Sequence, residues 1–225
     1  MSGREEMVMT HTNHRQGTVK DLKDDWVVVM MAATGINDEG SLPKLQQFVR
    51  LSLRHNPVNG GTSKVGTAVN IGWDRLIEGV GNTPGVRPIA ITFDNITDVA
   101  SFLEDLAGAD LGLSVVVSGL IPEVDRICRD IGTERHSVQY SLGIWGKTEM
   151  LPHPRVLEIG TMCGHGFVPF KLIHRKAEEV HRGCLSLDEA ALDLARPCIC
   201  GIVNTTRTRL LLQEYIEEMV EHHPA

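Results

Sequence analysis

Short runs of apolar and β-branched residues predict strands that are buried in a sheet. The longest run, residues 26–33, reads Trp-Val-Val-Val-Met-Met-Ala-Ala and lies between an Asp-Asp pair and Thr34-Gly35. An uninterrupted apolar run of this length is typical of a strand covered on both faces. The same reasoning predicts further strands at residues 87–93, 113–118, 136–144 and 156–162.

Apolar positions three or four residues apart predict helices between and after these strands. The first of them begins at Ser41, a good N-cap residue, two positions before Pro43. Helices are predicted at residues 41–55, 98–106, 122–131, 169–182, 187–195 and 205–221. Strands that alternate with helices favour an α/β fold with a mostly parallel sheet, and a ferredoxin-like βαβαββ unit fits the same pattern.

The chain divides into three parts, because no strand pattern appears beyond residue 163. Residues 1–22 are a polar N-terminal arm, residues 23–162 the α/β domain, and residues 163–225 a C-terminal helical segment. The arm carries His11 and His14, for which a frayed segment and a share in metal binding both stay open.

Residues 59–66, Asn-Gly-Gly-Thr-Ser-Lys-Val-Gly, are rich in glycine and hydroxyl groups. Such a segment is typical of a flexible loop, and its backbone N–H groups also suit an anion. The spacing of a P-loop is missing, which disfavours a nucleotide site.

Composition and charge exclude several classes of protein. With 225 residues, 42% of them hydrophobic, the chain is long enough for a large core and unlike collagen, coiled coils or disordered proteins. The net charge of −7 disfavours nucleic acid and anionic membranes as partners. No apolar run is long enough to span a membrane, and the polar N-terminus lacks the apolar core of a secretory signal. We therefore expect a cytoplasmic protein, and a homo-oligomer stays open.

Three of the five cysteines lie beside glycines at the ends of predicted elements. Cys163 is followed by Gly-His-Gly, and Cys198 and Cys200 stand between Pro197 and Gly201. An odd number of cysteines in a reducing compartment argues against a disulfide framework. Loops of this kind can direct several thiolates at one point. The other two, Cys128 on a helix and Cys184 in a turn, fit an inert thiol and a loop residue.

Three thiolates suit a [4Fe–4S] cluster held by Cys163, Cys198 and Cys200, with one iron left free of cysteine. That iron can act as a Lewis acid on a substrate. The grouping of one distant cysteine and a close pair is similar to the ligand sets of aconitase-type hydro-lyases and of cluster-dependent sulfur-transfer enzymes. The resemblance covers the ligand set alone, and the pair here is Cys-x-Cys where aconitases have Cys-x-x-Cys.

Polar residues near the pair extend this hypothesis to an enzyme. Asn204, Arg207 and Arg209 begin the helix that follows Cys200, where N–H groups and guanidinium groups can bind an anion. We therefore expect an oxygen-sensitive lyase or sulfur transferase of an anaerobic or microaerobic setting that acts on a small anionic substrate. Arg207 would bind the anionic group, and His165 would be the acid/base or a fourth ligand.

Four alternatives stay open. His165 together with the three cysteines is a ligand set for tetrahedral zinc in a structural or regulatory protein. Cys163 alone, with His165 as its base, fits a nucleophile on a strand-to-helix turn. The same cysteines also fit a maturation or interaction protein that carries a cluster for another enzyme, and incidental thiols would explain them without any chemistry.

Overall fold

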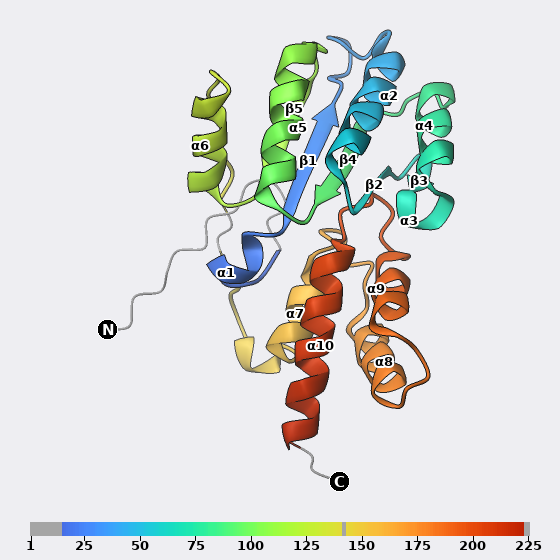
Figure 1. The fold of residues 1–225 in the computed structure, drawn as a ribbon, viewed down its shortest axis with the longest axis vertical. Helices are drawn as coiled ribbons and strands as arrows, with labels where there is room; N and C mark the ends of the chain where they lie inside the picture. The colour runs from blue at the N-terminus through green and yellow to red at the C-terminus, as the bar shows by residue number, and fades with distance from the viewer. Residues whose placement is uncertain (1–14, 141–142, 223–225) are drawn as a thin grey trace.

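The computed structural model describes residues 15–140 and 143–222, so the predictions about His11 and His14 lie outside the described residues. Within this part of the chain, one sheet has the strand order β3-β2-β4-β1-β5 (Figure 1). The strands are β1 (Trp26–Met31), β2 (Asn59–Thr62), β3 (Gly66–Thr67), β4 (Pro88–Phe93) and β5 (Ser114–Ser118). Residues 59–66, expected to be a loop, therefore form β2, the turn after it and the first residue of β3.

The prediction of a mostly parallel sheet is wrong, because every pair of neighbouring strands is antiparallel. Strands joined by a crossover do run parallel, β1 with β2 and β4 with β5. However, β4 lies between β1 and β2, and β1 lies between β4 and β5. Two crossovers interleaved in this way form the split β-α-β arrangement. The alternation of strands and helices along the chain indicates that helices connect successive strands. It does not indicate which strands become neighbours in the sheet.

The βαβαββ order is not observed either, because its last two predicted strands do not form. Residues 136–140 and 143–144 have no regular secondary structure and are mostly exposed. Residues 156–162 fall largely within a helix, α7 (Pro154–Thr161), which begins with Pro154 and is capped by the ring of His153. A short apolar run does not by itself distinguish a strand from a buried helix.

Four longer helices cover one face of the sheet: α2 (Ser41–Ser52), α4 (Trp73–Asn82), α5 (Ile96–Ala109) and α6 (Ile121–Asp130). Successive side chains along each strand point to opposite faces of the sheet. Val28 and Ile91 belong to the core under these helices, whereas Val27, Val29 and Ala90 belong to a second core on the opposite face.

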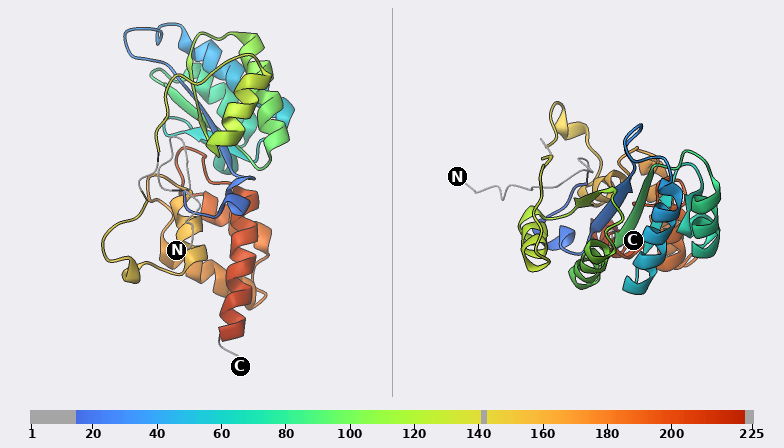
Figure 2. Two further views of the ribbon diagram at one scale, coloured as in Figure 1. Left: turned by 90° about the vertical axis from the view of Figure 1, so that its left-hand side faces the viewer. Right: turned by 90° about the horizontal axis from the view of Figure 1, so that it is seen from above.

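The second core joins the sheet to the C-terminal helices α7, α8 (Phe170–His181), α9 (Leu187–Ala195) and α10 (Thr205–His222). These helices pack on one another, and the left view of Figure 2 shows them below the α/β part. Gly160 of α7 allows α8 to come close, since a Cβ atom there would lie 2.6 Å from Cε1 of Phe170. The helical part as observed therefore includes α7. Among the described helices, none has the length and apolar character needed to cross a membrane.

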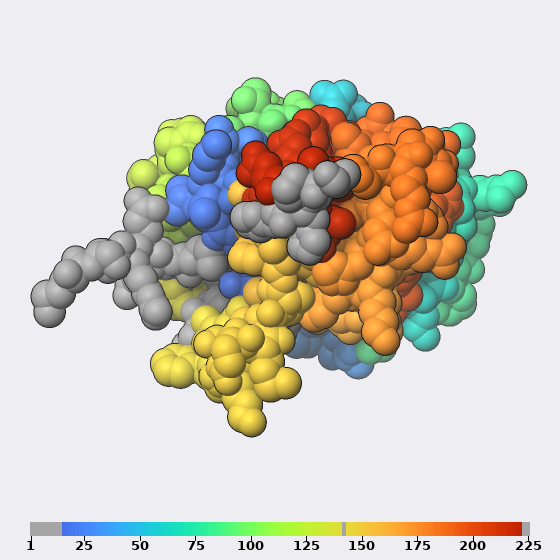
Figure 3. Space-filling view, turned by 90° about the horizontal axis from the view of Figure 1, so that it is seen from below, coloured from blue at the N-terminus to red at the C-terminus, as the bar shows by residue number. Residues whose placement is uncertain are grey.

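Short elements complete the fold: α1 (Val19–Leu22), α3 (Ala68–Ile71) and the 3₁₀ helices η1 (Leu53–His55) and η2 (Thr148–Met150). The segment 143–153, which contains η2, belongs to the yellow part of the chain, which stands out at the lower edge of the molecule in Figure 3. Trp145 and Met150 on this segment are exposed.

Candidate functional site

The fold brings the three predicted cysteines together from two loops. Cys163 follows the C-cap of α7, and Cys198 and Cys200 lie between α9 and α10. Cys163 and Cys198 are buried in the second core, 2% and 0% exposed, whereas Cys200 is half-buried. The thiol of Cys163 is hydrogen-bonded to Cys198, and the Sγ atoms of Cys198 and Cys200 are 3.8 Å apart. The three sulfurs thus form a continuous row from the core to the surface.

His165 extends this row at the surface. Its Nδ1 atom is 3.6 Å from Sγ of Cys200, and its ring is exposed. The ring of Phe167 stacks on it, with centroids 5.8 Å apart and an interplanar angle of 15°. The four residues proposed from the sequence as a sulfur and nitrogen ligand set are therefore neighbours.

Backbone N–H groups donate hydrogen bonds to all three sulfurs. The amides of His165 and Phe167 bind Cys163, those of Cys200 and Ile202 bind Cys198, and that of Ile202 also binds Cys200. Donors of this kind favour thiolates and are typical of sulfur atoms that ligate metals.

The three thiols share their protons unequally. Hydrogen bonds from the thiols of Cys163 and Cys200 hold the pKa of Cys198 well below its ordinary value, against the effect of burial. The hydrogen bond to Cys198, together with burial, raises the pKa values of Cys163 and Cys200. The hydrogen bonds therefore favour the thiolate form more at Cys198 than at Cys163 or Cys200.

Glycine and proline give the two loops their shape. Pro197 follows the last turn of α9, and Gly201 and Gly166 have positive φ angles of 73° and 70° that favour glycine. The amide of Gly166 closes a turn on the carbonyl of Cys163, with a distance of 3.0 Å. These turns expose the backbone N–H groups that bind the sulfurs.

Hydrogen bonds from the α/β part hold the loop after Cys200 in place. Three consecutive carbonyl groups accept from buried side chains: Gly201 from Thr92 at 3.0 Å, Ile202 from Arg15, and Val203 from Asn59 at 3.0 Å. The loop that carries the Cys-x-Cys pair is therefore fixed to the sheet and to the start of the described chain.

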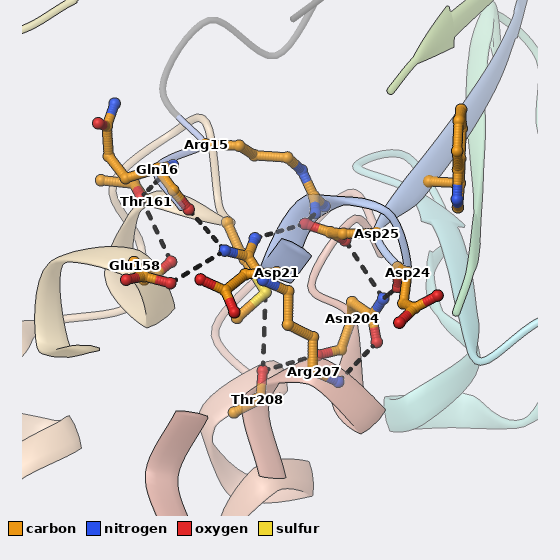
Figure 4. A network of polar contacts seen from close by, with 12 residues as sticks. Arg15, Gln16, Asp21, Asp24, Asp25, Glu158, Thr161, Asn204, Arg207 and Thr208 are labelled. Carbon is orange, nitrogen blue, oxygen red and sulfur yellow. Dashed lines mark hydrogen bonds and ion pairs between the residues drawn. The ribbon is translucent and has the colours of Figure 1, made fainter. Parts of the chain in front are cut away.

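Arg207, predicted to bind an anionic substrate, is buried in an ionic network (Figure 4). Its guanidinium group lies 2.6 Å from Asp25 and 3.2 Å from Glu158, and it donates to the carbonyl of Gln16 at 2.6 Å. Arg15 also pairs with Asp25. A guanidinium group neutralised by two carboxylates is a poor receptor for a further anion, so these surroundings give the predicted role of Arg207 no support.

Asn204 and Arg209 also have structural partners. The side chain of Asn204 caps α10 by accepting from the amide of Arg207 at 2.9 Å, and its Nδ2 atom donates to the carbonyl of Asp24 at 3.0 Å. Arg209 is half-buried and lies 3.7 Å from Asp188. Their roles in substrate binding stay predictions.

Sequence reasoning did not find Arg15, Asp25 and Glu158. In the sequence, Asp25 stands at the boundary of a predicted strand, and Glu158 lies in a segment predicted to be a strand. Their partners are far away along the chain, so no local spacing could indicate the network.

Within residues 15–140 and 143–222, no three or more His, Cys, Asp or Glu side chains are arranged to hold a metal ion as they stand. At the candidate site the thiols are turned toward one another as hydrogen-bond partners. Comparisons of this chain with protein-family models, with curated proteins and with solved structures find no match.

Proposed function

We propose that the chain is a metal-binding protein in which Cys163, His165, Cys198 and Cys200 bind one tetrahedral zinc ion. The observation that supports this proposal is the unbroken row of four donor groups, contributed by two loops and supplied with backbone hydrogen bonds. Three sulfurs and one imidazole nitrogen are a ligand set that zinc commonly takes.

Two of the distances between neighbouring donors suit a single ion. Two thiolates bound at about 2.3 Å to a tetrahedral zinc ion are about 3.8 Å apart, and a thiolate and an imidazole nitrogen are about 3.6 Å apart. The corresponding distances here are 3.8 Å between Cys198 and Cys200 and 3.6 Å between Cys200 and His165. Binding requires the thiols to exchange their mutual hydrogen bonds for a common ligand, by rotation of the side chains.

Zinc at this place would cross-link the loop after α7 to the loop between α9 and α10. The second of these loops is bound to the sheet through Gly201, Ile202 and Val203. The free energy of binding would therefore stabilise the helical part on the sheet. The proposed role of the metal is structural.

The second candidate is the [4Fe–4S] cluster on Cys163, Cys198 and Cys200 in a lyase or sulfur transferase that acts on a small anionic substrate. The observation that favours it is that three sulfurs have backbone donors, whereas the fourth group of the row is an exposed histidine. Three cysteines would leave one iron of the cluster without a cysteine ligand. Thiolates on different irons of a cluster stand farther apart than the sulfurs of Cys198 and Cys200 do here.

A variant of this candidate is a protein that carries the cluster to another enzyme. Such a carrier needs apolar surface beside its ligands, and Phe167 and Ile199 are 45% and 41% exposed next to His165 and between Cys198 and Cys200. Transfer of a reconstituted cluster to an apo-enzyme would distinguish the carrier from an enzyme.

Cobalt(II) titration of the reduced, metal-free protein under nitrogen tests the zinc centre. We expect one cobalt ion per chain, with the sulfur-to-cobalt charge transfer and strong visible bands of tetrahedral coordination. Cys200→Ser should weaken binding by at least about tenfold, since it removes a ligand, and Cys184→Ser, at an exposed cysteine in a turn, should leave it unchanged. A pale octahedral spectrum, or binding that Cys200→Ser does not alter, would contradict the proposal.

A further inference from the structure

The row of thiols has a second property that does not depend on a bound metal. Sγ of Cys198 is in contact with two other thiols, and the residues of the Cys198–Cys200 pair are separated only by Ile199. Residues two apart in sequence can bring their Cα atoms into the range that a disulfide bond allows. The sulfurs need to close from 3.8 Å to about 2.05 Å, which is within reach of side-chain rotation.

Exposure differs along the row. Cys200 is half-buried, whereas Cys198 and Cys163 are almost completely buried. A small oxidant from solvent therefore reaches Cys200 first, and the nearest thiol that can react with the product is that of Cys198.

We propose that Cys198 and Cys200 form a reversible disulfide bond when a peroxide reaches Cys200. In the first step the sulfur of Cys200 attacks one oxygen of hydrogen peroxide. The O–O bond breaks, the sulfur is oxidised by two electrons to a sulfenic acid, and the other oxygen leaves as water with the thiol proton. In the second step the sulfur of Cys198 attacks Sγ of Cys200, the S–O bond breaks, and the hydroxyl group takes up a proton and leaves as a second water. Two thiols and one peroxide thus give one disulfide and two waters.

The disulfide would remove two donors from the candidate site. Cys163 and His165, which are not adjacent in the row of contacts, would be left. Oxidation would therefore also end metal binding at this place, as a consequence of the same bond.

Cys184 provides a matched internal control. It is exposed, more so than Cys200, and its sulfur contacts the carbonyl of Arg182 at 3.9 Å. If exposure alone decided reactivity, Cys184 would be oxidised first. If a neighbouring thiol decides the outcome, Cys200 forms a disulfide while Cys184 stays reduced.

The experiment uses the full-length, reduced, metal-free protein and one equivalent of hydrogen peroxide. Remaining thiols are alkylated, and the digested protein is analysed by mass spectrometry under non-reducing conditions. We expect a Cys198–Cys200 disulfide, seen as the loss of two hydrogens and of two alkylation sites, while Cys184 is still alkylated. Treatment with a dithiol should restore both sites.

The variant Cys200→Ser tests the order of events, because it changes a half-buried position and leaves the core intact. We expect peroxide consumption by this variant to slow by at least about tenfold, since Cys163 and Cys198 are shielded from solvent. A Cys163–Cys198 disulfide formed as fast as oxidation of the unchanged protein would overturn the proposal. So would oxidation of Cys184 at the same rate, or accumulation of sulfinic acid at Cys200 beside a reduced Cys198. Because no metal is present, none of these outcomes depends on the zinc proposal.

Discussion

Gly201 lies directly against the backbone of Gly60. A Cβ atom on Gly201 would come within 2.2 Å of the carbonyl carbon and 2.4 Å of the carbonyl oxygen of Gly60. Gly201 follows Cys200 in the sequence, and Gly60 is in β2. The contact between these two glycines therefore sets the distance between the cysteine loop and the sheet.

The variant Gly201→Ala should disrupt this contact. Alanine meets the backbone of β2 and also has to adopt a φ angle of 73°. Gly183→Ala is the control, because Gly183 has a φ angle of 71° and no described atom within 4 Å of the added Cβ. We expect a loss of about 1 kcal/mol in the free energy of unfolding for Gly183→Ala, and at least about 3 kcal/mol for Gly201→Ala. Equal losses in urea denaturation would show that the close approach has no energetic consequence.

The sequence predicts the elements of the fold better than their arrangement. The buried strand at 26–33 and the helices at 41–55 and 187–195 are confirmed as β1, α2 with η1, and α9. These elements follow local rules of periodicity, capping and chain breaking. Strand order depends on which crossovers interleave, and no local pattern of apolar residues carries that information.

At the candidate site, too, local features could be predicted from the sequence, whereas long-range contacts could not. Glycines beside Cys163, Cys198 and Cys200 indicated loops that could bring sulfurs together, and the described structure places them in contact. The role of Arg207 could not be predicted in the same way, because its partners Asp25 and Glu158 come from remote segments. An arginine near a helix N-terminus has the same sequence pattern whether it binds a ligand or a buried carboxylate.

Replacing Arg15 should loosen the cysteine loop. The Arg15 side chain is buried and donates to the carbonyl of Ile202, two residues after Cys200. We expect Arg15→Met to raise the rate at which a colorimetric reagent modifies the thiol of Cys200 several-fold, in a background with Cys128→Ser and Cys184→Ser. Arg175→Met is the control, since Arg175 is 73% exposed and pairs with Glu179 on the surface of α8. Unchanged thiol reactivity in Arg15→Met would show that the loop does not depend on this anchor.

Removing Arg207 should destabilise the protein strongly. It leaves Asp25 and Glu158 buried with one cation fewer, and the loss of one partner from a buried ion pair costs about 3–5 kcal/mol. Arg209→Met, on the same helix but half-buried beside Asp188, should change the free energy of unfolding by no more than about 0.5 kcal/mol. Urea denaturation of Arg207→Met and Arg209→Met compares the two, and a similar, small effect for both would refute the importance of the network.

Asp25 and Glu158 should give opposite dependences on pH. Burial acts to raise the pKa of Asp25, but the guanidinium groups of Arg15 and Arg207 outweigh it and hold this pKa below its ordinary value of 3.8. Its contribution to stability is present above about pH 4 and is lost as the pH falls through the folded pKa. Burial raises the pKa of Glu158 above its ordinary value of 4.5, so its contribution is present below that pH and is lost as the pH rises through the folded pKa.

Denaturation from about pH 3 to about pH 7 checks these signs. The loss of stability caused by Asp25→Asn should grow as the pH rises, and the loss caused by Glu158→Gln should shrink. Parallel curves for the two variants would mean that the carboxyl groups titrate alike in the folded protein, contrary to their surroundings.

Metal analysis of the purified protein tests the central proposal most directly. The protein is purified without oxygen and without added metal or chelator, and zinc, iron and acid-labile sulfide are measured per chain. We predict one zinc ion, no visible absorbance, and a lower melting temperature after zinc is removed by a chelator. About four irons with sulfide and a brown colour would contradict the zinc centre and establish the cluster instead. A protein without metal that also fails to bind added zinc would contradict both.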